Sequence, residues 1–257
     1  MEKNIRPLIL VSNDDSIEAN GVHALIDVLV NFGDVVAVCP AHPQSGQSMA
    51  LTVATPLRIT RVEDYKDAKM YKVNGTPVDC IKLAMHTVLD RKPDLVVSGI
   101  NHGSNASINV IYSGTMGAAF EGCAFGIPAI GFSLTDHSPN ADFTPCLPFI
   151  HKIVKSVLDN GLPQGVALNV NIPNSIPHPT EMRVTKGCKA NWSDEYRKYT
   201  DPWGGTFYML TGKFVNEEPD NTDTDEWCLS HGIVSVVPVA LDRTAPSDID
   251  TILRILT

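Results

Sequence analysis

The sequence has no apolar run long enough to cross a membrane and no excess of positive charge. Met1 to Arg6 are mostly polar or charged, and the apolar run Leu8 to Val11 is far shorter than the core of a secretory signal. With 20 Lys and Arg against 29 Asp and Glu, the chain carries a net charge of −9, which opposes binding to a long polyanion. We therefore expect a cytoplasmic protein that binds neither a membrane nor a long nucleic acid.

Several sequence motifs of enzymes and metal sites are also missing. The six cysteines lie far apart without a CxxC pair or the Cys/His spacing of a zinc site, so they are predicted to be reduced thiols in the core. The chain has no GxSxG elbow, no GxxxxGK[ST] loop and no GxGxxG fingerprint. Serine-hydrolase chemistry, triphosphate binding and dinucleotide binding therefore have no support. A small anionic substrate stays compatible with the negative charge, because a bound divalent cation reverses the local field.

Strand-like and helix-like segments alternate over the first two thirds of the chain. Short apolar runs predict strands at 8–12, 35–39, 95–100, 128–132 and 166–172, and helical spacing predicts helices at about 22–30, 78–88, 115–125 and 143–158. Asn20 is the expected N-cap of the first helix and Gly33 its stop, whereas Thr76, Pro77 and Asp79 form the start of the second. This alternation predicts an α/β fold with a Rossmann-like, doubly wound and mostly parallel sheet.

The sequence changes character after about Asn174, where it becomes rich in Pro, Asn, Thr and Trp. We expect a single domain over residues 1–257, with a Rossmann-like core at about 1–173 and extensions at about 174–257 that serve oligomerisation. The β-prone runs Thr206–Leu210 and Ile233–Val237 have no crossover helices to cover them, which predicts C-terminal hairpins that pack on a second subunit. The apolar segment Ile252–Ile255 offers a means of exchange between protomers, or alternatively a short helix on its own subunit.

Polar side chains follow three of the predicted strands. Asn13, Asp14 and Asp15 follow the first, Ser45 lies in the loop after the second, and Asn101 follows the strand 95–100. The ligand crevice of such a sheet lies beyond the carboxyl ends of its strands, so these residues are expected to meet there. Adjacent carboxylates with hydroxyl and amide oxygens suit one Mg²⁺ or Mn²⁺ ion. Taken singly, each could instead be a turn, cap or loop residue.

A second group of small and polar residues follows the strand 95–100. The segment 101–105 reads Asn-His-Gly-Ser-Asn, and Tyr112-Ser113-Gly114-Thr115 stands at the start of a predicted helix. Glycines allow close approach of a ligand, and the free N–H groups of a helix N-terminus bind phosphate. A flexible loop with Ser113 as an ordinary N-cap is the alternative. For His42 and His102 we expect a surface or capping role.

Together these motifs resemble the SurE family, the stationary-phase survival proteins with 5′/3′-nucleotidase activity. The matching blocks occur in order along nearly the whole chain: Ile9–Asp15, Ser45-Gly46 with Ser48, Gly75–Cys80, Pro93–Asn105, Tyr112–Gly122, and Thr224-Asp225 with Gly232–Pro238. In two places the chain departs from the family pattern. Ser16 stands where Gly is usual, and Asn20 stands where Pro or a small residue is common.

The resemblance implies a metal-dependent phosphomonoesterase that hydrolyses nucleoside 5′- and 3′-monophosphates. It implies one divalent ion, Mg²⁺ or Mn²⁺, and a homodimer or homotetramer with exchanged C-terminal elements. The implied site residues are the following: metal ligands Asp14, Asp15, Ser45 and Asn101, and phosphate contacts at Asn101, Ser113, Gly114 and Thr115.

Asp14 and Asp15 are the candidate catalytic residues. One of the two carboxylates would take the proton of an attacking water, and a covalent phospho-aspartate at Asp14 is the alternative mechanism. Two rival functions come from other classes. A phospho-receiver domain would need an acceptor Asp where Asn101 stands and would be about half as long, whereas a non-catalytic nucleotide-binding module would be distinguished only by a phosphatase assay.

Overall fold

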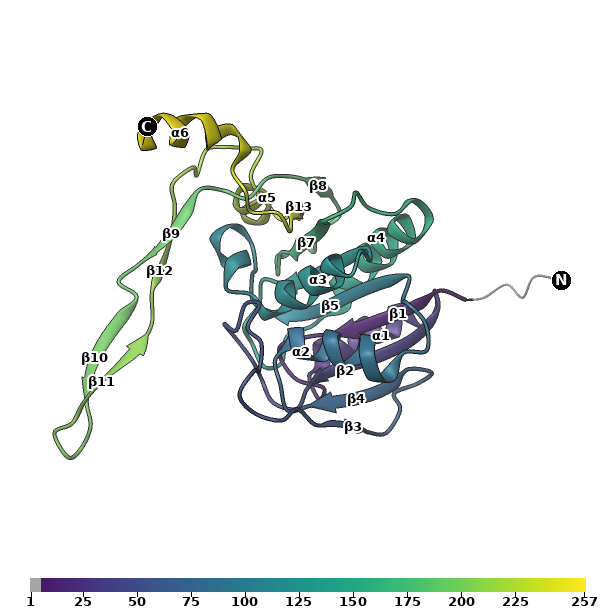
Figure 1. Cartoon of the computed structure of the whole chain (residues 1–257). Coiled ribbons are helices and arrows are strands. Elements are labelled where there is room, and N and C mark those ends of the chain that lie inside the picture. Colours follow the sequence, from purple (N-terminus) through teal and green to yellow (C-terminus); the bar gives the residue numbers. More distant parts are fainter. Residues whose placement is uncertain (1–5) are drawn as a thin grey trace.

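The computed structural model describes residues 6–257, and a nine-stranded, mostly parallel sheet forms its centre (Figure 1). The strand order is β3-β4-β2-β1-β5-β6-β7-β13-β8, and the pairs β3–β4 and β7–β13 are antiparallel. The strands are β1 Leu8–Ser12, β2 Asp34–Pro40, β3 Ile59–Arg61, β4 Lys69–Val73, β5 Leu95–His102, β6 Ala129–Leu134, β7 Val166–Ile172, β8 Met182–Val184 and β13 Val234–Ala240. The predicted α/β class with a mostly parallel sheet is confirmed.

Helices cover both faces of this sheet, as expected for a doubly wound fold. On one face, α1 (Asn20–Leu29) and α4 (Leu147–Asn160) bury Ile9 and Val11 of β1; on the other, α2 (Pro77–Leu83) and α3 (Gly114–Ala124) bury Leu8 and Leu10. Successive residues of β1 thus enter opposite cores, which explains why the strand is apolar throughout. Short helical turns lie at η1 Ala84–Val88, η2 Ser107–Ile111, η3 Thr144–Cys146 and η4 Pro246–Asp248.

Local capping follows the sequence in two of the three predicted places. Thr76 and Asp79 form the expected capping box at the start of α2, and Ser113 caps α3 by accepting from Met116 N. The prediction for α1 is wrong by one residue, because the N-cap is Ala19 and Asn20 is already helical without a side-chain cap bond. This helix also ends at Leu29, before Gly33.

The structure confirms the prediction for the cysteines and corrects the one for Asn101. All six cysteines are free and buried, as predicted. Asn101, by contrast, does not follow its strand: β5 continues to His102 and pairs with β6 beyond an irregularity between Ser98 and Asn101. The site side chain of Asn101 is therefore fixed by sheet pairing rather than carried on a loop.

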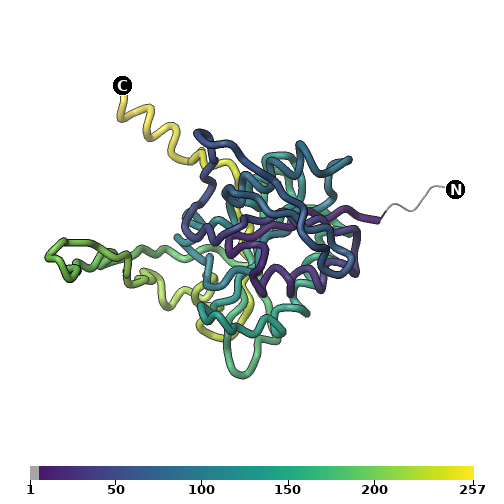
Figure 2. The backbone as a smooth tube through the Cα atoms, turned by 90° about the horizontal axis from the view of Figure 1, so that it is seen from below, coloured from purple at the N-terminus to yellow at the C-terminus, as the bar shows by residue number. Residues whose placement is uncertain are grey.

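A long antiparallel hairpin arm and a C-terminal helix project from the core (Figures 1 and 2). In the arm, β9 (Ala190–Ser193) pairs with β12 (Lys213–Asn216), and β10 (Tyr196–Thr200) pairs with β11 (Thr206–Leu210). The chain then forms α5 (Asp225–Ser230), returns to the sheet as β13, and ends in α6 (Ile249–Leu256).

The C-terminal hairpins are confirmed, but the strand predicted at 233–237 is not left uncovered. It becomes β13, which pairs with β7 on one side and β8 on the other, so that the central sheet draws on both halves of the chain. None of the helices within residues 6–257 is long and apolar enough to span a bilayer.

Candidate metal and phosphate site

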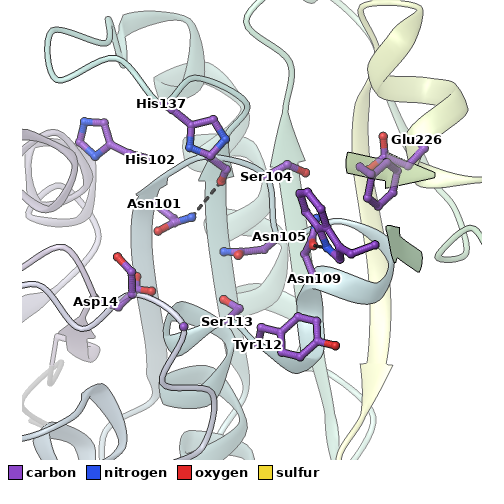
Figure 3. A pocket seen from close by; sticks show the side chains of 15 residues that line it. Asp14, Asn101, His102, Ser104, Asn105, Asn109, Tyr112, Ser113, His137 and Glu226 are labelled. Carbon is purple, nitrogen blue, oxygen red and sulfur yellow. Dashed lines mark hydrogen bonds between the residues drawn. The ribbon is translucent and has the colours of Figure 1, made fainter. Parts of the chain in front are cut away.

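A cavity of about 440 Å³ lies at the carboxyl ends of β1 and β5 (Figure 3). We call it the site cavity. It is lined by predicted site residues and by residues from the C-terminal half of the chain: Asp14, Ser45, Gly46, Asn101, His102, Gly103, Ser104, Asn105, Asn109, Tyr112, Ser113, His137, Trp192, Phe214 and Glu226. The structure therefore brings Asp14, Ser45, Asn101 and Ser113 together as the sequence predicts.

Asp14 is a buried carboxyl with a raised pKa on the cavity wall. Its side chain is buried, Thr115 Oγ1 donates to its Oδ1 at 2.5 Å, and there is room only for glycine at position 114, where a Cβ would come within 2.9 Å of Asp14 Cβ. Burial raises the pKa of Asp14 to about 6, the Thr115 hydrogen bond opposes that rise, and the charge of Asp15 adds to it. A cation in the cavity would favour the ionised form.

The orientation of Asn101 places a second oxygen beside this carboxyl. Asn101 Nδ2 donates to the Gly103 carbonyl at 2.8 Å, which leaves Oδ1 turned toward Asp14 (Figure 3). Two acceptor oxygens that face each other without a donor repel each other unless a proton or a cation lies between them. A hard divalent cation satisfies both of them.

Asp15 lies beside Asp14 but makes a different set of contacts. Its Oδ2 accepts from the backbone N of His102 at 3.0 Å and lies 3.2 Å from His102 Nδ1. The imidazole also packs edge-on against Phe143, with ring centroids 4.9 Å apart. His102 therefore lines the cavity and is not the surface or cap residue that the sequence suggested, whereas Asp15 is not itself among the lining residues.

The predicted phosphate contacts divide into two groups. Ser113 lines the cavity, and its Oγ accepts from Met116 N at 3.0 Å, which leaves the hydroxyl proton free to donate to a ligand. Gly114 and Thr115 instead lie against Asp14. Because the Thr115 hydroxyl already donates to Asp14, its direct contact with phosphate stays a prediction.

The loop that carries Ser45 is held from both ends. Gln44 N donates to the Asp14 carbonyl at 2.7 Å, and Ser48 is joined to the segment before α3 through its N to Tyr112 O at 3.0 Å and through its Oγ to Ile111 O at 2.6 Å. Ser45 lies between these two anchors in the sequence and lines the same cavity as Asn101.

A buried asparagine network beside the site was not predicted. Asn105 N donates to Asn171 Oδ1, Asn105 Nδ2 donates to Ser133 Oγ, and Asn169 Nδ2 donates to Asn105 O, each at 2.8 Å. These bonds fix the loop after β5 to the carboxyl ends of β6 and β7. The signal in the sequence is the pair of asparagines at alternate positions of the otherwise apolar strand 166–172.

The cavity wall contributed by the C-terminal half was also missed. Trp192 and Phe214 lie near the base of the hairpin arm and Glu226 lies on α5, so all three depend on tertiary folding. No local pattern in the sequence places the arm beside the carboxyl edge of the sheet.

The oxygen donors of the predicted ligand set match a hard cation. Within residues 6–257 no three His, Cys, Asp or Glu side chains are grouped to hold a metal, which gives no support to a zinc site. Two carboxylates with a hydroxyl and an amide oxygen are instead a set that leaves room for water and a phosphate oxygen around Mg²⁺ or Mn²⁺. The residues present therefore fit the expected group.

These features define the class: an α/β protein with a ligand site at the carboxyl edge of a doubly wound sheet. The family model described as "Survival protein SurE" matches residues 9–194, and the chain belongs to this family.

Similar proteins span nearly the full length of the chain. A relative from Christiangramia forsetii, named 5′-nucleotidase SurE, is 54% identical over 246 residues, which cover 93% of each chain. One from Flavobacterium johnsoniae with the same name is 51% identical and covers 95% of this chain and 94% of its own. A crystal structure of the SurE protein from Aquifex aeolicus superposes with a TM-score of 0.84 at 36% identity, covering 98% of this chain and 100% of that one.

Proposed function

We propose that this protein is a divalent-metal-dependent phosphatase that hydrolyses nucleoside 5′- and 3′-monophosphates. The names of its relatives support the nucleotidase activity. The observation that carries the site is the buried Asp14 carboxyl facing Asn101 Oδ1 on the wall of a cavity that also contains Ser45 and Ser113.

The metal would be held by Asp14, Asp15, Ser45 and Asn101. When bound, Mg²⁺ or Mn²⁺ polarises a phosphoryl oxygen and lowers the pKa of a water molecule. Asp14 is pre-positioned for this by Thr115, and the Asn101 amide by the Gly103 carbonyl. Asp15 Oδ1 has no protein partner within residues 6–257 and remains available, although Oδ2 is engaged by His102.

The phosphate would lie at the N-terminus of α3. Ser113 donates from the cavity wall, and the first N–H groups of the helix favour negative charge that accumulates on the phosphoryl oxygens. Asn101 lies on the same wall. The proton of the attacking water would pass to one of the two carboxylates, Asp14, which is bonded to Thr115, or Asp15, which is held by His102.

The extensions support the proposed homodimer or homotetramer. Five large apolar side chains of α6 are exposed, namely Ile249, Ile252, Leu253, Ile255 and Leu256, and the outer strands of the arm expose Tyr196, Tyr199, Phe207, Tyr208, Met209 and Leu210. Apolar surface of this extent on two projecting elements favours burial against another copy of the chain.

Release of phosphate from 5′-AMP, 3′-AMP and p-nitrophenyl phosphate tests the proposal. The protein should release phosphate from all three with Mn²⁺ or Mg²⁺ and should lose this activity in EDTA. Activity that is undiminished in EDTA would exclude metal dependence. The absence of turnover under every metal condition would leave a nucleotide-binding module in place of an enzyme.

A further inference from the structure

The site cavity extends well beyond the residues that would hold metal and phosphate. Figure 3 shows Glu226 on the side of the cavity away from Asp14, and the lining also includes Asn109, the indole of Trp192, which is bonded to Asn109, and the Phe214 ring packed against that indole. In the proposed function a phosphate group would occupy only the end near Ser113. The remainder of the cavity combines aromatic rings with a carboxyl, a composition suited to an organic group that carries N–H donors.

Trp192 is held as a fixed wall and does not depend on a ligand for its position. Its Nε1 donates to Asn109 Oδ1 at 2.9 Å, and its ring packs edge-on against Phe214 with centroids 5.7 Å apart. Between β11 and β12 of the arm, a Cβ at Gly212 would come within 2.7 Å of the indole. An anchored indole at a cavity wall offers a planar surface on which a nucleobase stacks with little loss of side-chain freedom.

Glu226 is the unsatisfied polar group of this end. Burial, followed by repulsion from Asp225, raises its pKa to about 7, and no hydrogen bond to its carboxyl opposes that rise. The neighbouring Asp225 shows the contrast, because its carboxylate accepts from the backbone N of Ser107, Cys188 and Glu226 at 2.7, 2.9 and 2.8 Å. A half-buried carboxyl without donors on the cavity wall is therefore free to accept them from a ligand.

We propose that this end of the cavity is a nucleobase subsite in which the base stacks on Trp192 and donates hydrogen bonds to the Glu226 carboxylate. The inference rests on the proposed function and names the part of the substrate that determines its specificity. Guanine presents two adjacent N–H donors, N1–H and the 2-amino group, which match the two oxygens of a carboxylate. Hypoxanthine is the same ring without the 2-amino group and loses one of the two bonds.

Comparison of GMP with IMP tests the subsite at pH 8, where the carboxylate is mainly ionised. The wild-type kcat/KM for GMP should exceed that for IMP at least about tenfold, as expected for loss of one hydrogen bond to a charged group. Glu226→Gln should reduce this ratio toward one, while p-nitrophenyl phosphate, which carries no base, is still hydrolysed. The matched control is Glu63→Gln, which removes an exposed carboxylate and should preserve the ratio.

Trp192→Leu tests the stacking wall. The variant should raise the KM for GMP and for IMP to the same extent, by about 5- to 150-fold, because stacking does not depend on the 2-amino group. Equal kcat/KM for GMP and IMP in the wild type, or a ratio that Glu226→Gln leaves unchanged while p-nitrophenyl phosphate is still hydrolysed, would overturn the subsite.

Nucleoside binding separates this inference from the phosphatase proposal. Guanosine should quench the tryptophan fluorescence of the wild-type protein at a concentration at least about tenfold lower than inosine, with or without metal. That outcome supports the subsite even in a protein that releases no phosphate. Equal affinity for the two nucleosides would overturn it even in an active phosphatase.

Discussion

Ser16 has a strained backbone conformation in the turn beside the proposed metal site. Its φ is 93°, a conformation that glycine adopts freely and that strains an L residue, and its carbonyl accepts from Asn13 Nδ2 at 2.7 Å. Glycine at this position would adopt the same backbone conformation without strain, whereas serine adopts it with strain. The turn keeps its shape, since Asn13 ties it together directly before Asp14.

Ser16→Gly should stabilise the protein by about 1 kcal/mol, because relief of the strained φ exceeds the added flexibility of the unfolded chain. Urea unfolding measures the change. Ser156→Gly is the control with the opposite sign, since Ser156 lies on the exposed side of α4 and glycine there should destabilise by about 0.5–1 kcal/mol. Destabilisation by both variants would contradict the strain at Ser16.

Thr115 also acts at the scale of a single residue, because its hydroxyl holds the Asp14 carboxylate in place. Thr115→Val removes the hydroxyl that donates to Asp14 Oδ1 and should lower kcat by about 10- to 150-fold, the equivalent of one hydrogen bond to a charged group. Thr115→Ser keeps the donor and should retain most of the activity. Steady-state kinetics with 5′-AMP measure both variants, and unchanged kinetics in the valine variant would remove Thr115 from the site.

At the scale of elements, the site depends on how α3 packs against the loop after β2. Gly117 faces this loop, and a Cβ on it would lie 2.1 Å from the Ser48 carbonyl oxygen. The same helix presents Ser113 to the cavity and Gly114 to Asp14. Close approach of a single helix therefore positions three parts of the site, which is why its sequence is rich in small residues.

Gly117→Ala should displace the loop that carries Ser45 and thereby reduce both stability and metal-dependent turnover. We expect a loss of about 1–3 kcal/mol in unfolding free energy, typical of overpacking. Gly187→Ala is the control, because a Cβ there would meet no atom closer than 3.7 Å. Full activity and stability of the Gly117 variant would show that the loop does not need this close contact.

The sequence predicted these elements better than it predicted the site around them. Apolar strands such as β1 and β7 were found at their observed bounds, because burial on both faces leaves a continuous apolar run. Asp14, Ser45 and Asn101 could be grouped because parallel strands end at one edge. Trp192 and Glu226 could not be placed, since their positions depend on where a long arm and a short helix fold back onto the cavity.

At the scale of the whole molecule, the arm and α6 project away from the core of sheet and helices (Figures 1 and 2). Every residue of α6 is exposed, although Ile252, Leu253 and Leu256 are apolar. An isolated helix of this length is marginal in water, so its stability depends on packing against another surface. The extensions are therefore the part of the chain that a second copy would order.

Deletion of residues 248–257 should reduce the oligomeric mass measured by light scattering and leave the core folded. The central sheet contains no residue of α6, so circular dichroism should show an intact fold in the truncated chain. A truncated protein with undiminished mass and stability would show that these residues hold no subunits together.

The most direct test of the account is calorimetric titration of Mn²⁺ into wild-type protein and Asp14→Asn. Asp14 provides the buried charge of the proposed ligand set, whereas the control Asp159→Asn alters an exposed carboxylate that pairs with Lys155 on α4. The Asp14→Asn variant should bind Mn²⁺ at least about 100-fold more weakly, because loss of residues that only support metal ligands already lowers metal affinity about 10- to 100-fold. Phosphate release from 5′-AMP should fall in parallel. The Asp159→Asn control should match the wild type in Mn²⁺ affinity and in phosphate release. Near-normal Mn²⁺ affinity and turnover in folded Asp14→Asn would contradict the account.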